Sequence, residues 1–317
     1  MNTLSQPKEE HRTYKAKGCE YLLNDKEKTA WIVKGPRVGR RRRYRIPETV
    51  DVEGVAYKVE SVEIGAFGKA QRLRHLVIPD SIEFVDEYNF CSLQSLRSIY
   101  IGKGLTYLSS WIFQLNKNLR SFVISKENPH LCVDNGIVYT TDGKCAVSTP
   151  FNVRHLNIKE GVEAIENVAF WWNPNLETIS LPSTLKSIGD NSFAGCPKIK
   201  KVVFPDGFER LISQCFWDCD SLETVELPST LKEMDYETFY RCKNLKTVII
   251  RAEHVLLVNA YCILPYKFIK NHYNDFDRDN QPIYLPKGCT LKVPKALVEE
   301  YKAHPLWAMA TNVEEIE

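Results

Sequence analysis

A pattern of apolar and polar positions recurs along most of the chain with a period of 23 residues. The segment that begins at Leu176 is repeated almost unchanged from Leu222, and a more divergent copy begins at Ile199 between them. Further repeats in the same pattern begin at Leu73, Leu96, Leu119, Val153 and Leu245, with 11 extra residues between the repeats at 119 and 153. Such self-similarity predicts stacked repeats that bury their apolar residues against one another.

Within each repeat, the apolar positions are 1, 4, 6, 10, 13 and 18. Positions 4 and 6 alternate with polar neighbours, which is typical of a short strand with one buried face. Proline follows at position 7 in four repeats and ends the strand, because it cannot donate a backbone hydrogen bond. Position 18 is phenylalanine in seven repeats, counting a degenerate first repeat that starts near Val50: Phe67, Phe90, Phe113, Phe170, Phe193, Phe216 and Phe239. We expect positions 13 to 21 to form a helical turn that directs this ring inward.

The chain outside the repeats suggests closing structures at both ends and one insertion. The expected parts are a loose N-terminus at 1–13, an N-terminal β cap at 14–58, the repeat solenoid at 59–250, and a C-terminal segment and cap at 251–317. A cap covers the bare edge of the first strand. Asp142-Gly143 between apolar runs predicts a β-hairpin in an insertion at 125–152. Pro294 begins a short predicted helix at 294–303.

The repeat motif is Leu-x-x-(Ile/Val)-x-(Leu/Ile)-Pro-x-x-Leu-x-x-Ile, followed by phenylalanine and often by cysteine. It resembles the leucine-rich repeats of the BspA-like surface-antigen family over roughly residues 45–250. The segment 44–67 is similar to the usual start of such arrays, and 291–301 with Trp307 is similar to their closing segment. The resemblance implies an α/β repeat solenoid, a curved right-handed coil with short parallel strands on one face and short helical turns on the other. It also implies a bacterial adhesion or binding protein rather than an enzyme.

Composition places the chain among ordinary globular proteins, with 44% hydrophobic and 26% charged residues. Its apolar runs are far shorter than the roughly 20 residues of a membrane-spanning helix, so we expect no transmembrane segment. The N-terminus lacks the apolar core of a secretory signal. We therefore expect a cytoplasmic protein if the sequence is the complete precursor, and a surface or secreted protein if a signal was removed. The ten cysteines are expected to be free thiols.

Catalytic and cofactor signatures are missing from the sequence, which has no Gly-x-Ser-x-Gly, His-Glu-x-x-His or phosphate-binding loop. Cys215 and Cys219 occupy repeat positions where small residues pack, and paired Cys-x-x-Cys zinc knuckles are absent. We expect no metal and no cofactor. A third, weaker interpretation is a hydrolase whose acids, among them Asp275 and Asp277, lie in the segment 251–290.

The main charge feature is a basic run formed by Arg40, Arg41, Arg42, Arg43 and Arg45. Residues 1–58 hold 14 Lys and Arg against 8 Asp and Glu, although the whole chain has a net charge of only +2. The run could contact phosphates, acidic glycans or lipids, or it could be a solvated hairpin. The small net charge argues against a dedicated nucleic-acid binder.

Two surfaces are candidates for ligand binding. Positions 3 and 5 of the strands form the outer sheet face, which carries His75, Tyr100 and His155. Position 19 and its neighbour provide large aromatic rings: Trp171, Trp172, Trp217 and Tyr240. Such rings are enriched at recognition surfaces, although they can also pack between coils. We therefore expect a monomeric, non-enzymatic protein-binding module, with glycan binding through exposed Trp and Tyr rings as the alternative.

Overall fold

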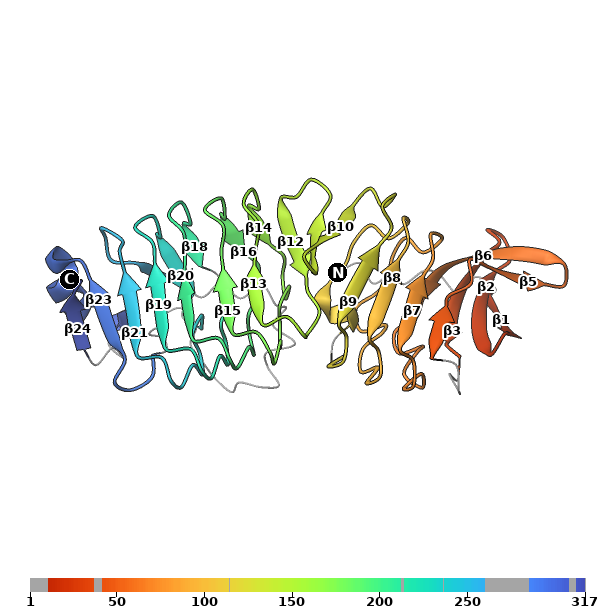
Figure 1. Cartoon of the computed structure of the whole chain (residues 1–317), viewed down its shortest axis with the longest axis horizontal. Coiled ribbons are helices and arrows are strands. Elements are labelled where there is room, and N and C mark those ends of the chain that lie inside the picture. Colours follow the sequence, from red (N-terminus) through yellow and green to blue (C-terminus); the bar gives the residue numbers. More distant parts are fainter. Residues whose placement is uncertain are drawn as a thin grey trace. The chain divides into compact units, whose positions relative to one another are not determined.

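A computed structural model describes residues 11–36, 42–113, 115–211, 214–235, 237–259, 285–307 and 312–316. The chain divides into two compact units, Met1–Gly136 (unit 1) and Ile137–Glu317 (unit 2). Both units are built mainly from strands stacked in the order of the sequence (Figure 1). Among the described residues, the helical elements are the 3-10 turns η1 (Ser110–Phe113), η3 (Lys295–Leu297) and η4 (Pro305–Trp307) and the short helix α2 (Val298–Ala303).

Unit 1 begins with an antiparallel meander of three strands, each turning back on the one before it. These strands are β1 (His11–Ala16), β2 (Cys19–Asn24) and β3 (Thr29–Lys34). The hairpin of β5 (Thr49–Val52) and β6 (Val55–Val62) completes the sheet, because β6 pairs in parallel with β3. The sheet order is β1-β2-β3-β6-β5. This meander precedes the repeats at the end where the sequence predicts a cap.

The repeats of unit 1 form a parallel sheet with the order β4-β7-β8-β9. Its strands are β4 (Arg43–Arg45), β7 (His75–Ile78), β8 (Ser98–Ile101) and β9 (Ser121–Ile124). The register places His75 beside Ser98 and Ser98 beside Ser121, so each rung lies 23 residues further along the chain. Equivalent repeat positions therefore form columns across the strands. A short strand β10 (Leu131–Asp134) ends the unit.

Unit 2 starts with the predicted hairpin, in which β11 (Ile137–Thr140) pairs antiparallel with β12 (Cys145–Ser148) around Asp142-Gly143. One row of parallel strands follows: β13 (His155–Asn157), β15 (Thr178–Ser180), β17 (Lys201–Val203), β19 (Thr224–Leu227), β21 (Thr247–Ile250), β23 (Thr290–Val293) and β24 (Asn312–Glu315). They pair as β13-β15 and as β17-β19-β21-β23-β24.

Each coil of unit 2 also contributes a second short strand to a second row. The members of this row are β14 (Ala164–Ile165), β16 (Ser187–Ile188), β18 (Arg210–Leu211), β20 (Glu233–Asp235) and β22 (Leu257–Asn259). β12, β14 and β16 pair in parallel, as do β18, β20 and β22. Because β22 pairs with β20, the coiling continues past Ile250, where the sequence pattern fades.

The expected helical turns at positions 13 to 21 were wrong. In unit 2, position 13 lies in the second row of strands, and the rest of the stretch consists mostly of tight turns, with the 3-10 turn η1 as the exception in unit 1. Positions 16 and 20 adopt the left-handed conformation: φ is 55° at Asn191 and 59° at Asp218, for example. A residue with positive φ interrupts a right-handed helix. The fold is therefore a solenoid of stacked strand coils with very little helix in the described residues.

The phenylalanines at position 18 form one buried file in each unit. In unit 1, ring centroids lie 5.2 Å apart for Phe67 and Phe90, and Phe113 continues the file. In unit 2, Phe170, Phe193, Phe216 and Phe239 follow one another with centroid distances of 5.1, 5.2 and 6.3 Å. Every ring is at most 2% exposed. Each coil thus buries its ring against its neighbours, as the repeat requires.

The last described coil of unit 2 packs on α2. Tyr301 of α2 is fully buried, and its hydroxyl accepts a hydrogen bond from the backbone N–H of Leu256 at 3.1 Å. Leu297 and Val298, at the start of the same helical segment, are half-buried. The nine cysteines within the described residues are free thiols. Among the described residues, no helix has both the length and the apolar character that crossing a membrane requires.

Candidate binding surfaces

The outer face of the unit 1 sheet carries several of the predicted ligand-binding residues. Arg43 of β4 is the register partner of His75, and the His75 ring lies 2.7 Å (Nδ1 to Oγ) from Ser98 on the next strand. Two residues further along the strands, Tyr100 is 39% exposed and Val123 is 48% exposed. The side chains between these positions point inward and are buried, as period-2 alternation demands.

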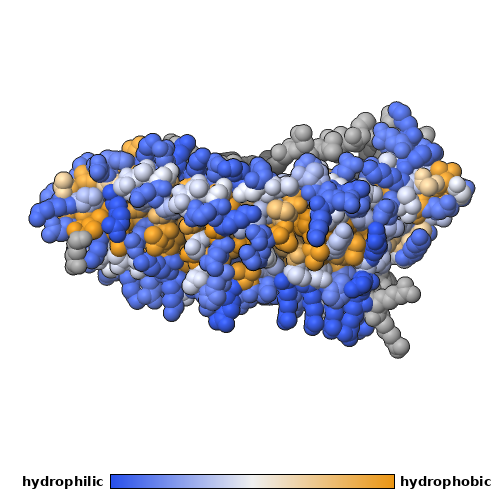
Figure 2. Space-filling view, turned by 45° about the horizontal axis from the view of Figure 1, so that its top comes forward, coloured by the Kyte–Doolittle hydropathy of each residue, from blue (hydrophilic) through white to orange (hydrophobic). Residues whose placement is uncertain are grey.

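A shallow hollow of about 400 Å³ lies on this face. Arg43, Arg45, His75, Tyr100 and Val123 are among the residues that line it. The part of Figure 2 that shows unit 1 has a band of hydrophobic surface bordered by strongly hydrophilic side chains. The structure therefore brings the basic run together with two of the sheet-face candidates. Arg40 and Arg41 lie outside the described residues.

A column of four arginines runs along the start of the same strands. Arg42, Arg74, Arg97 and Arg120 occupy successive rungs, and we call them the arginine row. Their backbones are in register, because each N–H donates to the carbonyl of the arginine one rung before, at 2.7, 2.8 and 2.8 Å. None of the four side chains has an acidic partner among the described residues. Partial burial, followed by the charges of Arg42 and Arg97, lowers the pKa of Arg74.

The equivalent column of unit 2 has a different charge pattern. Its successive members are Arg154, Glu177, Lys200, Glu223 and Lys246, which alternate in sign. Arg154 and Glu177 lie 2.7 Å apart, and Lys246 and Glu223 lie 3.1 Å apart. Opposite charges on adjacent rungs attract, whereas like charges repel. Unit 2 pairs the charges of this column within the chain, whereas the described residues offer the arginines of unit 1 no acidic partner.

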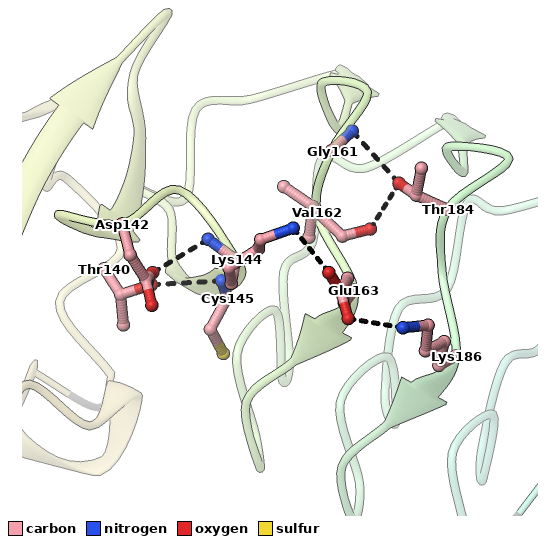
Figure 3. A network of polar contacts seen from close by, with 9 residues as sticks. All are labelled: Thr140, Asp142, Lys144, Cys145, Gly161, Val162, Glu163, Thr184 and Lys186. Atoms are coloured by element: carbon pink, nitrogen blue, oxygen red, sulfur yellow. Dashed lines mark hydrogen bonds and ion pairs between the residues drawn. The ribbon is translucent and has the colours of Figure 1, made fainter.

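The hairpin of unit 2 continues this rule of alternation. Figure 3 shows Glu163 between Lys144 of the hairpin and Lys186 of the following coil. The ion-pair distances are 2.5 Å to Lys144 and 2.6 Å to Lys186. Hydrogen bonds from Lys144 and then from Lys186 lower the pKa of Glu163 to about 2. Thr184 links the same coils by accepting from Gly161 N–H and donating to the Val162 carbonyl.

Charge pairing is also present in unit 1 away from the arginine row. Lys58 binds Glu83 at 2.9 Å, and Arg45 binds Glu48 at 2.8 Å. The row therefore stands out within its own unit as well as against unit 2. Sequence reasoning overlooked it, because attention fell on the consecutive arginines near Arg43. The signal was present: position 2 is arginine in three successive repeats from Leu73 onward.

His155, the other predicted histidine, is exposed on β13 of unit 2. Its Nδ1 lies 2.9 Å from the Thr178 hydroxyl on β15, the same arrangement that His75 has with Ser98. Thr178 is the register partner of His155 in the parallel pair of β13 and β15. The strand β15 (Thr-Ile-Ser) places no charged side chain beside His155. His75 and His155 lie in different units, so each belongs to a separate surface.

The predicted aromatic residues of unit 2 are mostly packed against their neighbours. Trp217 and Tyr240 are half-buried, and the guanidinium of Arg241 lies 5.6 and 5.7 Å from their ring centroids. Trp171 is half-buried and its ring centroid lies 5.6 Å from that of Trp172. Trp172 is 44% exposed and is therefore the ring of this group with the most free surface.

Trp172 is held in place by a glycine on the next coil. A side chain at Gly195 would place its Cβ within 2.8 Å of the Trp172 ring, and Gly195 itself has a φ of +68°. The backbone N–H of Trp172 also donates to the Ala194 carbonyl at 2.8 Å. The ring thus lies flat over backbone and presents its other side to solvent, a geometry suited to stacking.

Cys215 and Cys219 are both fully buried. The Cys219 thiol donates to a backbone carbonyl, and burial raises its pKa well above the ordinary value. No group of three or more His, Cys, Asp or Glu suited to a metal ion is present within the described ranges. The proposed hydrolase acids Asp275 and Asp277 lie outside those ranges.

Comparison with known proteins identifies the family. The model of the BspA type leucine-rich repeat region matches residues 54–133 and 144–263, with six copies. These matches cover more than half of the chain, which therefore belongs to this family. The comparison with curated proteins finds no match.

Several solved structures are similar to this chain. A leucine-rich repeat protein from Bacteroides ovatus is 17% identical, with a TM-score of 0.58 over 96% of this chain and 76% of that chain. The pneumococcal vaccine antigen PcpA is 12% identical, with a TM-score of 0.48 over 96% and 99% of the two chains. A leucine-rich repeat protein from Eubacterium ventriosum is 13% identical, with a TM-score of 0.45 over 86% and 100%. The likeness to the Bacteroides protein shows the fold alone.

Proposed function

We propose that the chain is a non-enzymatic binding module that holds a protein partner on its outer sheet faces. The observation that carries this proposal is the open, regular face formed by positions 3 and 5 of the strands. On it, Tyr100 and Val123 in unit 1 and Val203 in unit 2 expose 39, 48 and 47% of their surfaces. Exposed apolar residues on a rigid sheet favour protein contacts.

The hollow in unit 1 supports binding rather than catalysis. It is shallow, and its lining mixes Arg43 and His75 with the carboxylate of Asp80. Asp80 is itself occupied, because its Oδ1 accepts from the Lys103 N–H at 2.9 Å. Bond-breaking sites usually need an enclosed pocket with converging acids and bases. Membership of the BspA-type family also favours a binding role at a cell surface.

Site-specific photo-crosslinking tests the proposal. The photo-crosslinking residue p-benzoylphenylalanine replaces Val123 on the outer sheet face of unit 1 or Val203 on that of unit 2. Leu257 is the control position. Leu257 is 63% exposed but belongs to the second row of strands. The proposal expects protein adducts from Val123 or Val203 and few from Leu257, with extracts of the source organism. Equal adducts from all three positions, or none from either sheet face, would contradict it.

Glycan binding is a second candidate, supported by the exposed face of Trp172. A flat ring with one free side can stack on a sugar. The test is a glycan array with the wild type, Trp172→Ala and Tyr107→Ala, where Tyr107 is equally exposed at 44% but lies in unit 1. Loss of a glycan signal in Trp172→Ala alone would favour this candidate. Absence of any signal in the wild type would remove it.

A further inference from the structure

The charge pattern of unit 1 identifies the kind of partner that its sheet face fits. The arginine row stacks four like charges at successive rungs, about 4.8 Å apart along the sheet. Unit 2 shows that the same repeat accommodates alternating charges at this position. A row of arginines that has no acidic partner in the described part of the chain is therefore not imposed by the fold. Such a row attracts negatively charged groups.

Arginine rather than lysine occupies every rung of the row. The planar guanidinium binds carboxylate, sulfate or phosphate oxygens with two parallel hydrogen bonds, whereas lysine acts as a point charge. Arg43 extends the positive surface from the row into the hollow, where it is the register partner of His75. Arg45 is already bound to Glu48, and Asp80 is already bound by Lys103, so these two charges are satisfied within the chain.

The neighbouring surface selects among anions. Tyr100 and Val123 lie exposed on the strands whose first residues follow Arg97 and Arg120. A sulfated glycan or a phosphate backbone is hydrophilic throughout and gains little from these apolar side chains. A polypeptide that combines carboxylates with apolar side chains buries apolar surface on Tyr100 and Val123 and neutralises the arginines.

On this basis we infer that the arginine row and the adjoining hollow of unit 1 bind an extended acidic segment of a protein, with its carboxylates on Arg74, Arg97 and Arg120. The inference rests on the proposed function and specifies the partner of one of its two sheet faces. An extended chain advances about 3.3 Å per residue, so about five residues span the row. Every second residue then places a carboxylate on the row, which gives three carboxylates in all. The apolar side chains between them point to the opposite side of the peptide, towards Tyr100 and Val123.

Fluorescence anisotropy with a defined probe tests the inference on the full chain. The probe is a fluorescein-labelled peptide of alternating glutamate and valine, about ten residues long, and glutamine replaces glutamate in the matched control. We expect the glutamate peptide to bind and the glutamine peptide to bind at least about tenfold more weakly. Raising NaCl from about 0.1 M to about 0.5 M should weaken binding of the glutamate peptide alone.

Two charge-matched double variants locate the site. Arg97→Ala with Arg120→Ala should weaken the glutamate peptide about tenfold or more. Arg154→Ala with Lys200→Ala removes the same charge from the equivalent column of unit 2 and should change binding by less than about twofold. Arg97→Lys with Arg120→Lys keeps the charge but loses the paired hydrogen bonds, so it should bind the glutamate peptide more tightly than the alanine pair and more weakly than the wild type, which separates binding from any effect on folding.

Equal binding of the glutamate and glutamine peptides would overturn the inference, and so would equal effects of the two alanine pairs. The inference would also fail if a heparin oligosaccharide or oligothymidylate bound at least about tenfold more tightly than the glutamate peptide. Its failure differs from failure of the proposed function. Protein adducts from Val203 that persist while the glutamate peptide does not bind would retain the binding module and reject the acidic partner. If neither Val123 nor Val203 gave protein adducts, the proposed function itself would be rejected.

Discussion

The thiol of Cys219 donates a hydrogen bond to the carbonyl oxygen of Phe193, 3.2 Å away on the preceding coil. Cys196 and Cys242 make the same bond to Phe170 and Phe216, at 3.3 and 3.0 Å. In unit 1 the Asn116 side-chain amide donates to the Phe90 carbonyl at 2.8 Å from the same repeat position. A side-chain donor at this position therefore ties four of the phenylalanine turns to the next coil. Burial keeps the Cys196 and Cys219 thiols protonated, because it raises the pKa of Cys196 to about 12 and that of Cys219 well above the ordinary value.

Removing this donor should weaken the stack. Cys219→Ala leaves the Phe193 carbonyl without its thiol donor and opens a small cavity, so we expect the free energy of unfolding to fall by about 1–2 kcal/mol. Cys91→Ala, at a half-buried position of unit 1, is the control and should change it by less than about 0.5 kcal/mol. Urea denaturation followed by circular dichroism measures both. Equal midpoints for Cys219→Ala and the wild type would contradict the role of the thiol.

The left-handed position 20 offers a test of the corrected turn. Gly195→Ala should destabilise the protein by about 1–3 kcal/mol, because it combines a φ of +68° with a Cβ 2.8 Å from the Trp172 ring. Leu115 occupies the same repeat position with a φ of 61° and is 43% exposed. Leu115→Gly should therefore be neutral or slightly stabilising. Thermal melting of the two variants compares them directly, and a larger loss for Leu115→Gly would refute the account of this turn.

Glu163 should make stability depend on pH in the acid range. Its pKa in the folded protein is lowered to about 2, well below the ordinary value of a glutamate, so its ion pairs contribute fully above the unfolded pKa. The contribution disappears as the pH falls from about 4.5 towards 2. Glu163→Gln should be less stable than the wild type at pH 7 and should show a smaller loss on acidification. Urea midpoints across this pH range measure the effect, and parallel curves for the two proteins would contradict it.

His75 reports on the positive potential of the unit 1 face. Partial burial, followed by the charges of Arg43, Arg97 and Arg74, lowers its pKa below the ordinary value of about 6.5. Asp80 is the acid that lines the same hollow, and it is bound by Lys103. Arg97→Ala should raise the His75 pKa, and so should addition of the glutamate peptide. NMR titration of the His75 ring protons measures each shift. An unchanged His75 would show that the arginines do not act on it.

The repeat and its core could be deduced from the sequence because packing dictates them. Each phenylalanine file needs one ring per coil, and the strands need alternation at positions 4 and 6, so both leave a period in the sequence. The turns could not be deduced in the same way. Residues as different as Asp218, Trp172 and Gly195 occupy the left-handed position 20, which has no common side chain to reveal it.

The binding surface was only partly visible in the sequence. His75, Tyr100 and Arg43 were recognised separately, and the parallel register brought them together. The arginine row escaped notice because its members lie 23 residues apart or further and become neighbours only in the stacked sheet. Charge columns are a property of the stack, and they emerge when the repeats are aligned by position.

By our proposal, unit 1 keeps a positive row, without acidic partners among the described residues, for an external partner. Arg97→Glu tests it most directly, because this one change gives the row the alternating pattern of unit 2. The account predicts a thermal midpoint that is unchanged or higher, since repulsion with Arg74 and Arg120 becomes attraction, together with loss of glutamate-peptide binding. A lower midpoint with binding retained would contradict it, since the row would then serve the fold rather than a partner.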